Sequence, residues 1–156
     1  PNLILSVITE NADCQYGLDG LAFDKSGDLF LGNFGDGTIL KATFDENNNV
    51  EACDVWAADP EQMRTTDGIG FDEAGNLYVA DFSENAVAVV RPDGTVERMA
   101  QSPDCDGSNG GLDQPGEPIV FAGRLIVTCF DIVTGPDKVN TGHDRPFTIT
   151  SLELAE

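Results

Sequence analysis

The chain contains a repeat of 48 residues, and this repeat limits the folds that it can adopt. Residues 18–34 read LDGLAFDKSGDLFLGNF, and residues 66–82 read TDGIGFDEAGNLYVADF, so each position in the first segment has a counterpart 48 residues later. A weaker third copy, EPIVF followed by GRLIV, begins at Glu117. A repeat of this length indicates stacked supersecondary units, and four short strands fit into each unit.

Short apolar and β-branched segments separated by turn residues predict strands along the whole chain, and no segment has the pattern of a long helix. The expected units cover residues 18–58, 67–100 and 117–154, with strands at 18–24, 28–33, 37–44, 50–57, 67–72, 76–82, 86–91, 95–100, 117–121, 124–130 and 146–154. Residues 2–9 also have the composition of a strand, which would complete a blade preceding the first unit. The third unit lacks a fourth strand.

An all-β chain of this size can form a sandwich or a propeller, and the 48-residue repeat favours a propeller of four-stranded blades. Residues 1–156 then form a single half-propeller of about three blades, which is too few to close a ring. The other half would come from an upstream chain segment, from a second chain, or from a twofold copy of this chain. In the core between blades we expect the repeated apolar residues Phe23, Phe71, Phe121, Leu29, Leu77 and Leu125.

The chain is strongly acidic, with 28 Asp and Glu against 8 Lys and Arg and a net charge of −20. Nucleic acid and anionic membrane are therefore unfavourable partners, since phosphate groups need cationic contacts. The acidity has two readings that are compatible with each other. It can be a solvated shell, or part of it can converge on a bound cation. The sequence does not distinguish an extracellular or periplasmic location from a cytoplasmic one.

The four cysteines, the single histidine and one acidic loop add little to a functional assignment. No two cysteines have CxxC spacing, so a structural zinc site is not expected, and free thiols compete with up to two disulfides. Residues 104–109, DCDGSN, have the composition of a calcium loop but not the glycine position or closing Glu of an EF-hand, so we expect an ordinary loop or a lid. His143 lies in another loop, as a proton shuttle or as an exposed bystander.

Three carboxylates occupy one equivalent position when the repeats are aligned, namely Asp19, Asp67 and Glu117. The innermost strands of a propeller converge on the channel axis, so these side chains should face one small space. Closely placed carboxylates do not all stay ionised without a cation, and hard cations bind oxygen ligands. An ordinary Asp-Gly turn remains the alternative reading for Asp19 and Asp67. Asn33 and Asp81, at the ends of the second strands, are candidate substrate contacts or strand caps.

The motif Asp-Gly-Leu/Ile-x-Phe-Asp-x-x-Gly-Asp/Asn-Leu resembles the blade signature of the gluconolactonase, senescence marker protein and luciferin-regenerating enzyme family. The ending is also similar, with LIVTC at 125–129, a long loop, and PFTIT at 146–150. The resemblance covers residues 17–154. It implies a six-bladed propeller of which this chain is the second half, with one divalent cation, often Ca²⁺, at the mouth of the channel.

Carried onto this sequence, the resemblance makes Asp67 both a metal ligand and the group that takes a proton from water or substrate. Asp19 falls where the family usually has Asn, which adds a charge and could shift the metal preference or affinity. The expected ion is Ca²⁺, with Zn²⁺, Mg²⁺ or Mn²⁺ as alternatives. Glu117 lies where the family has no usual ligand, so we expect it to be a channel-lining candidate substrate contact or a loop carboxylate and not a metal ligand. The family's remaining ligand and its substrate-gripping residues lie in the half that is not present in this chain.

These observations predict a divalent-metal-dependent hydrolase of small molecules, lactonase-like or esterase-like, that is complete only in an assembled ring. A carboxylate beside a bound cation can act as general base, and the cation can polarise a carbonyl or phosphoryl oxygen. The alternative is a non-catalytic propeller that binds a small ligand or a protein partner, because the propeller fold alone does not fix a function.

Overall fold

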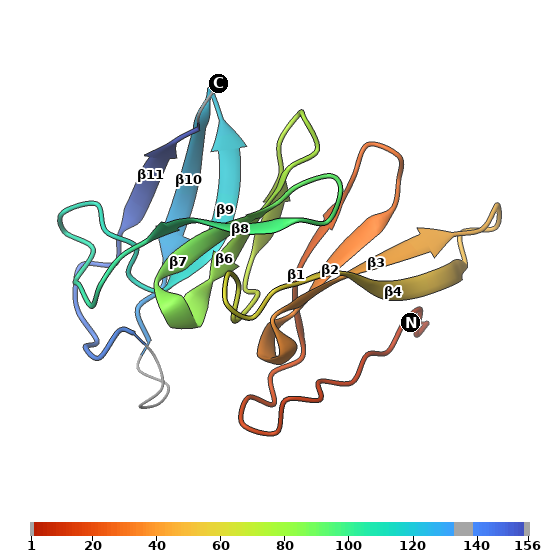
Figure 1. The fold of residues 1–156 in the computed structure, drawn as a ribbon, viewed down its shortest axis with the longest axis horizontal. Helices are drawn as coiled ribbons and strands as arrows, with labels where there is room; N and C mark the ends of the chain where they lie inside the picture. Colours follow the sequence, from red (N-terminus) through yellow and green to blue (C-terminus); the bar gives the residue numbers. More distant parts are fainter. Residues whose placement is uncertain (1, 133–138, 155–156) are drawn as a thin grey trace.

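The computed structural model describes residues 2–132 and 139–154, which form three antiparallel sheets arranged like adjacent blades (Figure 1). The first sheet contains β1 (Leu18–Phe23), β2 (Leu29–Asn33), β3 (Thr38–Phe44) and β4 (Val50–Ala58). The second contains β5 (Ile69–Phe71), β6 (Leu77–Asp81), β7 (Ala86–Val90) and β8 (Val96–Gln101), and the third contains β9 (Pro115–Phe121), β10 (Arg124–Cys129) and β11 (Ile149–Glu153). The predicted all-β class and propeller-type fold are confirmed, and the third sheet has three strands among the described residues.

Each of the two complete sheets has strands in sequence order, because each strand is joined to the next by a short connection. Between the second and third strands stand two short 3-10 turns, η1 (Phe34–Asp36) and η2 (Phe82–Glu84). In Figure 1 these turns lie at the lower end of the sheets, while the β1–β2 and β5–β6 turns lie at the upper end. The starts of β1, β5 and β9 therefore face the same end as η1 and η2.

The second sheet is the best buried part of the molecule, because it packs against a neighbour on both faces. Every residue of β6 and β7 is buried. Leu77 and Val79 face the first sheet, where they pack with Phe30 and Ile39, while Tyr78 and neighbouring side chains pack against Leu125 and Val127 of the third sheet. Alternate residues of a strand point to opposite faces, so a strand between two sheets must be apolar at both sets of positions.

The prediction of six core residues is wrong for two of them. Leu29, Leu77 and Leu125 are buried, and Phe71 packs against the core with its ring centroid 5.0 Å from that of Phe30. Phe23 and Phe121, however, are 59% and 68% exposed. Phe23 lies on the first sheet, whose outer face has no neighbouring sheet among the described residues. Phe121 pairs with Arg124, whereas Val120 pairs with Leu125 as Phe71 pairs with Leu77, so Val120 and not Phe121 takes the position of Phe71.

Residues 2–9 form no strand, which differs from the secondary structure expected for them. The segment is nevertheless close to the first sheet, where Leu5 and Val7 pack against the cluster formed by Leu29, Leu31, Leu40 and Ala42. The alternate residues Ile4 and Ile8 are 67% and 82% exposed. A strand is defined by hydrogen bonds to a neighbour, and this segment has no such neighbour here. Its role in completing a preceding blade stays a prediction.

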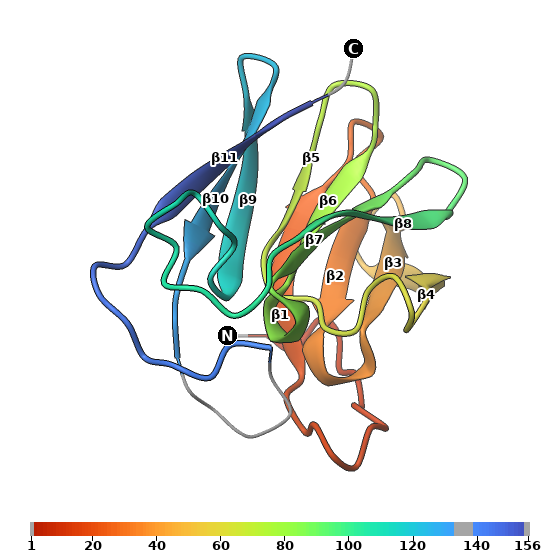
Figure 2. The same ribbon diagram turned by 60° about the vertical axis from the view of Figure 1, so that its left-hand side comes forward.

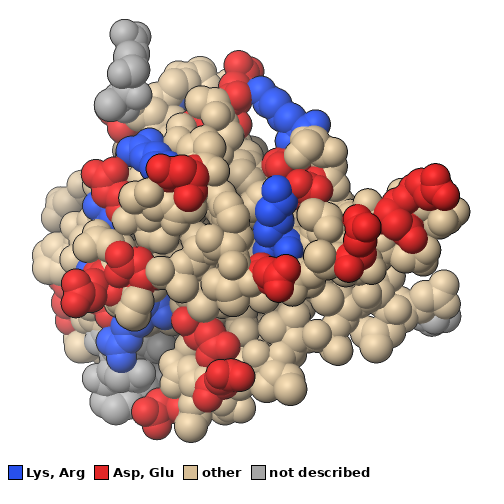
Figure 3. Space-filling model, turned by 45° about the vertical axis from the view of Figure 1, so that its right-hand side comes forward, with Lys and Arg blue, Asp and Glu red and all other residues tan. Residues whose placement is uncertain are grey.

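The remaining features concern the surface and the cysteines. All four cysteines are free thiols. Acidic side chains spread over the face drawn in Figure 3, and some of them stand beside basic ones. The ion pairs of the described residues include Lys41–Asp28 and Arg91–Glu97. Within the described ranges, no helix has the length and hydropathy that a membrane span requires.

Candidate functional site

The starts of the three innermost strands meet through their backbones. The Gly20 amide donates to the carbonyl oxygen of Asp67 at 3.2 Å, and the Gly68 amide donates to the carbonyl oxygen of Gly116 at 2.7 Å. The Asp67 amide also donates to Ala80 in the neighbouring β6, at 2.9 Å. These bonds hold the residues before β5 between the residues that begin β1 and β9.

Glycine is required at the two points of closest approach. A Cβ at Gly20 would collide with the Asp67 carbonyl oxygen and would lie 2.8 Å from the Ile69 nitrogen. A Cβ at Gly68 would collide with Glu117 Oε2 and would lie 2.8 Å from Glu117 Cα. The Asp-Gly pair of the repeat thus has two parts, a glycine that lets inner strands touch and a carboxylate that precedes it at the mouth.

The mouth carboxylates Asp19, Asp67 and Glu117 influence one another electrostatically. Burial raises the pKa of Asp67 to about 7, and the negative charges of Asp19 and Glu117 add to this effect. Burial, followed by the charge of Asp19, also raises the pKa of Glu117. Within the described part of the chain, none of the three forms an ion pair with a Lys or Arg. The three carboxylates therefore lie near enough for Asp19 and Glu117 to act on the pKa of Asp67, without a Lys or Arg partner among the described residues.

The mouth carboxylates suit a hard cation by their chemistry, although they do not form a complete coordination shell. They present oxygen atoms only, which are the ligands that Ca²⁺ and Mg²⁺ prefer, and their mutual repulsion would be relieved by a positive ion. Across residues 2–132 and 139–154, no group of three or more His, Cys, Asp or Glu side chains is arranged to hold a metal ion. Any bound ion would therefore need ligands from elsewhere in a ring, or water.

Asp81 and Asn33, the predicted substrate contacts, are buried and hydrogen-bonded to the chain itself. Asp81 accepts hydrogen bonds from the Arg64 amide at 2.9 Å, from the Thr65 amide at 2.9 Å and from the Thr65 hydroxyl at 2.8 Å, and Arg98 Nη2 lies 3.4 Å away. Burial raises the pKa of Asp81, while these donors lower it. Asn33 hydrogen-bonds to Thr9 and Asp36. Contact of either residue with a substrate stays a prediction.

His143 and the acidic loop of residues 104–109 lie beside the third sheet and not among the mouth carboxylates. His143 Nδ1 is 2.7 Å from the carbonyl oxygen of Asp131, and Asp104 accepts a hydrogen bond from the Thr141 amide at 3.1 Å. The loop between β8 and β9 is thus fastened to the loop that follows β10. Sequence reasoning assigned no function to the buried Asp113 in the first of these loops, and its only signal was the length and polarity of the segment.

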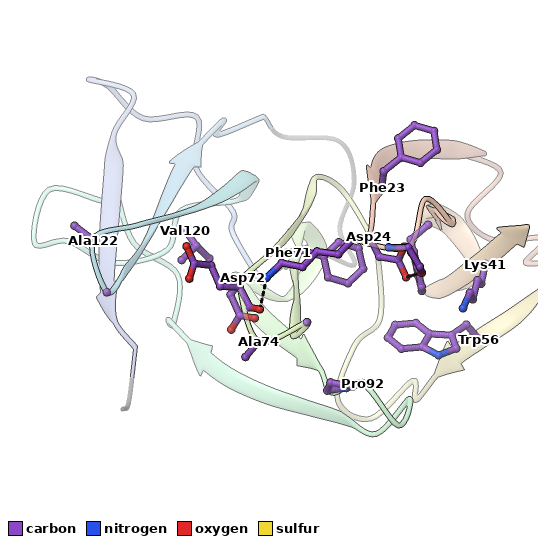
Figure 4. A pocket seen from close by; sticks show the side chains of 16 residues that line it. Phe23, Asp24, Lys41, Trp56, Phe71, Asp72, Ala74, Pro92, Val120 and Ala122 are labelled. Atoms are coloured by element: carbon purple, nitrogen blue, oxygen red, sulfur yellow. Dashed lines mark hydrogen bonds between the residues drawn. The ribbon is translucent and has the colours of Figure 1, made fainter.

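A groove of about 1090 Å³ lies at the opposite end of the strands, where the β1–β2, β5–β6 and β9–β10 turns come together (Figure 4). Phe23, Phe71 and Trp56 line it, and the Phe30 ring beneath packs edge-on against Trp56 with centroids 4.8 Å apart. The Lys25 ammonium donates to the Glu73 carbonyl oxygen across the groove at 2.7 Å. None of the sequence-predicted site residues lines this groove.

Solved structures with a similar fold include the following three. The luciferin-regenerating enzyme matches with a TM-score of 0.60 at 18% identity, over 87% of this chain and 45% of that one. Regucalcin from Agrobacterium tumefaciens, described as a calcium-binding protein, matches with a TM-score of 0.54 at 18% identity, over 72% and 37%. A PQQ-bound aldose sugar dehydrogenase from Streptomyces coelicolor matches with a TM-score of 0.51 at 14% identity, over 87% and 42%.

The similarity to known proteins is found in the structure and not in the sequence. No protein-family model matches the chain, and no curated protein matches it in sequence. The chain spans less than half the length of each structure described above. At identities of 18% and below, the likeness concerns the fold. The resemblance inferred from the blade motif is confirmed at that level: the chain has the blade architecture shared by the luciferin-regenerating enzyme and regucalcin.

Proposed function

We propose that this chain is half of a divalent-cation-dependent hydrolase that acts on lactones or related esters, with Asp67 as its general base. The observation that carries the proposal is the placing of Asp67 near Asp19 and Glu117, whose negative charges act on it and which no Lys or Arg among the described residues pairs with. A carboxylate beside a bound cation can accept the proton of an attacking water as general base. The similarity in fold to a lactonase-like family supports the same assignment.

The residues at the mouth would divide the work as follows. A divalent cation, when bound, supplies Lewis acidity toward the substrate carbonyl and lowers the pKa of a bound water. Asp67 accepts the proton of the attacking water as the new C–O bond forms, and returns it to the leaving alkoxide when the ester C–O bond breaks. Asp19 would be the co-ligand, and the added negative charge of an Asp at this position favours a doubly charged ion. Glu117 would face the substrate side of the channel.

Further blades are part of the proposal, because both ends of the half-ring expose apolar side chains. Leu21 is 62% exposed on the first sheet, and Ile119 and Ile149 are 61% and 70% exposed on the third. Contiguous exposed apolar surface marks an interaction site. The second sheet packs against a neighbouring sheet on both faces, so further blades are the partners we expect for the exposed faces of the first and third sheets. Sedimentation of the purified chain gives the mass of the assembled particle directly.

The hydrolase proposal is tested on that particle with a panel of lactones, aryl esters and phosphotriesters in the presence of Ca²⁺, Mg²⁺, Mn²⁺ or Zn²⁺. Asp67→Asn should lower the turnover rate by a factor on the order of 10² to 10⁴, the usual contribution of a general base. Asp54→Asn, an exposed position on β4, is the matched control and should leave the rate unchanged. Full activity of Asp67→Asn would rule out its assignment as the base.

The aromatic groove supports a second candidate function, a propeller that binds a small ligand without catalysis. Its lining combines Phe23, Trp56 and Phe71 with charged side chains, which is the composition of many ligand sites. The fluorescence of Trp56, the single tryptophan, would report a ligand entering this groove. If no substrate of the panel is hydrolysed while cations still bind at the mouth, this function is favoured over hydrolysis.

A further inference from the structure

Four of the five buried side-chain polar atoms that lack a hydrogen-bond partner in the described residues belong to two loops, the one between β8 and β9 and the one between β10 and β11. They are Asp113 Oδ1, Gln114 Nε2, Asn140 Oδ1 and Thr148 Oγ1, and the fifth is Thr66 Oγ1 elsewhere. Native proteins satisfy almost all of their buried polar groups, so a concentration of exceptions needs an explanation. Three of the four atoms are oxygens, which indicates that the missing partner is a donor or a cation.

Asp113 is held rigidly at the centre of this place. It is 2% exposed, and both of its neighbours are anchored, since the Leu112 amide donates to Ser102 Oγ at 2.8 Å and the Gln114 amide donates to Asn85 Oδ1 at 3.0 Å. Figure 2 shows the β8–β9 loop, which contains Asp113, lying beside β11. The position of this carboxylate therefore does not depend on a flexible surface turn.

The other oxygens come from the segments on either side of the β10–β11 connection. Asn140 is 1% exposed, and its Nδ2 donates to Asp131 Oδ1 at 2.9 Å, which leaves its own oxygen free. A Cβ at Gly107 would collide with Thr148 Oγ1 and would lie 3.3 Å from Asp113 Cβ, so that hydroxyl and Asp113 flank the same glycine.

The electrostatic surroundings of Asp113 favour a positive ion over a water molecule. Burial raises the pKa of Asp113 to about 6, and the charges of Asp131, Asp144, Asp106 and Asp104 add to it. Among the ion pairs formed by the described residues, none links Asp113 to a Lys or Arg. A water would supply hydrogen bonds but would leave the negative charge uncompensated.

We propose that the two loops enclose a second cation site, in which Asp113, the Asn140 amide oxygen and the Thr148 hydroxyl bind a calcium-like hard cation. Mixed carboxylate and neutral oxygen ligands, with water and backbone carbonyls completing the shell, are typical of Ca²⁺ and unlike the nitrogen and sulfur ligands of Zn²⁺. Only one of the three proposed ligands is a carboxylate. The site therefore does not contain a group of three His, Cys, Asp or Glu side chains among the described residues. It is separate from the mouth, to which residues 114–117 connect it.

The experiment uses the whole chain with Asp67→Asn as the background, so that the mouth is disabled and the result does not depend on hydrolysis. Calcium chloride is titrated by calorimetry and by thermal unfolding into this background and into the same chain with Asp113→Asn or Thr148→Val. We expect one Ca²⁺ to bind to the background, and each added substitution to weaken binding by a factor on the order of 10 to 100. Asp54→Asn added to the background is the charge-matched control and should bind as before.

Thermal unfolding in EDTA gives an independent reading. Asp113→Asn should raise the midpoint, because it removes a buried carboxylate surrounded by like charges, and it should abolish the rise that Ca²⁺ causes in the background. If Asp113→Asn does not fold, Thr148→Val still tests the proposed site. Absence of Ca²⁺ binding in the background, or equal binding with both substitutions, would overturn the proposal. The first result would leave the hydrolase proposal untouched.

Discussion

Two aspartates of the middle blade, one at the end of β6 and one just before β5, differ in the groups that surround their carboxylates. Asp81, at the end of β6, is completely buried and accepts hydrogen bonds from Arg64, Thr65 and Arg98. Asp67, which precedes β5 and is bonded through its amide to Ala80, faces two other carboxylates. The chain thus supplies donors to the first acid and like charges to the second.

The contrast separates an acid that maintains the structure from one that is available for chemistry. Donors and an arginine partner make the charge of Asp81 part of the fold, and losing it would leave several groups unpaired. Like charges make the ionised form of Asp67 unfavourable, so that it is stabilised by gaining a proton or a cation. Burial raises the pKa of both acids, and the surrounding groups account for the difference.

The largest expected effect is that of removing the buried acid. Asp81→Ala should lower the free energy of unfolding by about 3–5 kcal/mol, because the Arg98 charge and the amides of Arg64 and Thr65 lose their acceptor. Urea denaturation monitored by Trp56 fluorescence measures the change. Asp67→Ala, at the other site, should not destabilise the metal-free chain. Equal losses in the two variants would remove the distinction drawn between these acids.

The next effect concerns the contact that brings the mouth together. Gly68→Ala should cost about 1–3 kcal/mol, since its Cβ has no room beside Gly116 and Glu117 and the inner strands must separate. Gly17→Ala is the matched control, because the nearest atom to a Cβ there is 3.9 Å away, and it should change stability by less than about 0.5 kcal/mol. Tolerance of Gly68→Ala would show that the inner strands are not closely fixed.

The smallest effect is the dependence of stability on pH through Asp67. Its pKa is about 7 in the folded chain and near 3.8 when unfolded, so the folded state holds the proton more tightly. Its contribution to stability is therefore full below about pH 4 and is lost as the pH rises through 7. In EDTA, Asp67→Asn should flatten this slope and be more stable than the parent at pH 8, by on the order of 1 kcal/mol after solvent screening.

Chemical denaturation of the parent and of Asp67→Asn at pH 5, 6, 7 and 8 gives the comparison. Asp54→Asn, at the exposed position on β4, should follow the parent at every pH. Parallel curves for the parent and Asp67→Asn would mean that the pKa of the Asp67 carboxyl is not raised by folding.

The sequence alone predicted the blades, because they are local to the repeat, but it aligned the third copy one residue out. Val120 pairs with Leu125 as Phe71 pairs with Leu77, so Gly116 and not Glu117 is the counterpart of Asp67. The burial of Phe121 was wrongly predicted for the same reason, and that of Phe23 because a repeat shows what its copies share and not which copy has a neighbour. Residues 2–9 have strand composition, but strand pairing depends on a partner.

Contacts distant in sequence account for what was missed. Asp113 and Thr148 lie 35 residues apart in the sequence, and Asp104 and Thr141 lie 37 apart, within loops whose lengths do not follow the repeat. The hydrogen-bonded environment of Asp81 depends on the linker around Arg64 and Thr65, which lies outside the repeat pattern. Neither arrangement has a signature in spacing or composition, because each depends on segments that meet only in the folded chain.

The two-sided burial of β6 and β7 has a consequence for amide hydrogen exchange. These strands are covered by a sheet on each face and bonded to a strand on each edge, so their amides can exchange only when the neighbouring blades part. The outer strands β4 and β11 can instead open singly. Deuterium should therefore enter from both ends of the half-ring and reach the middle blade last, at the rate of global unfolding.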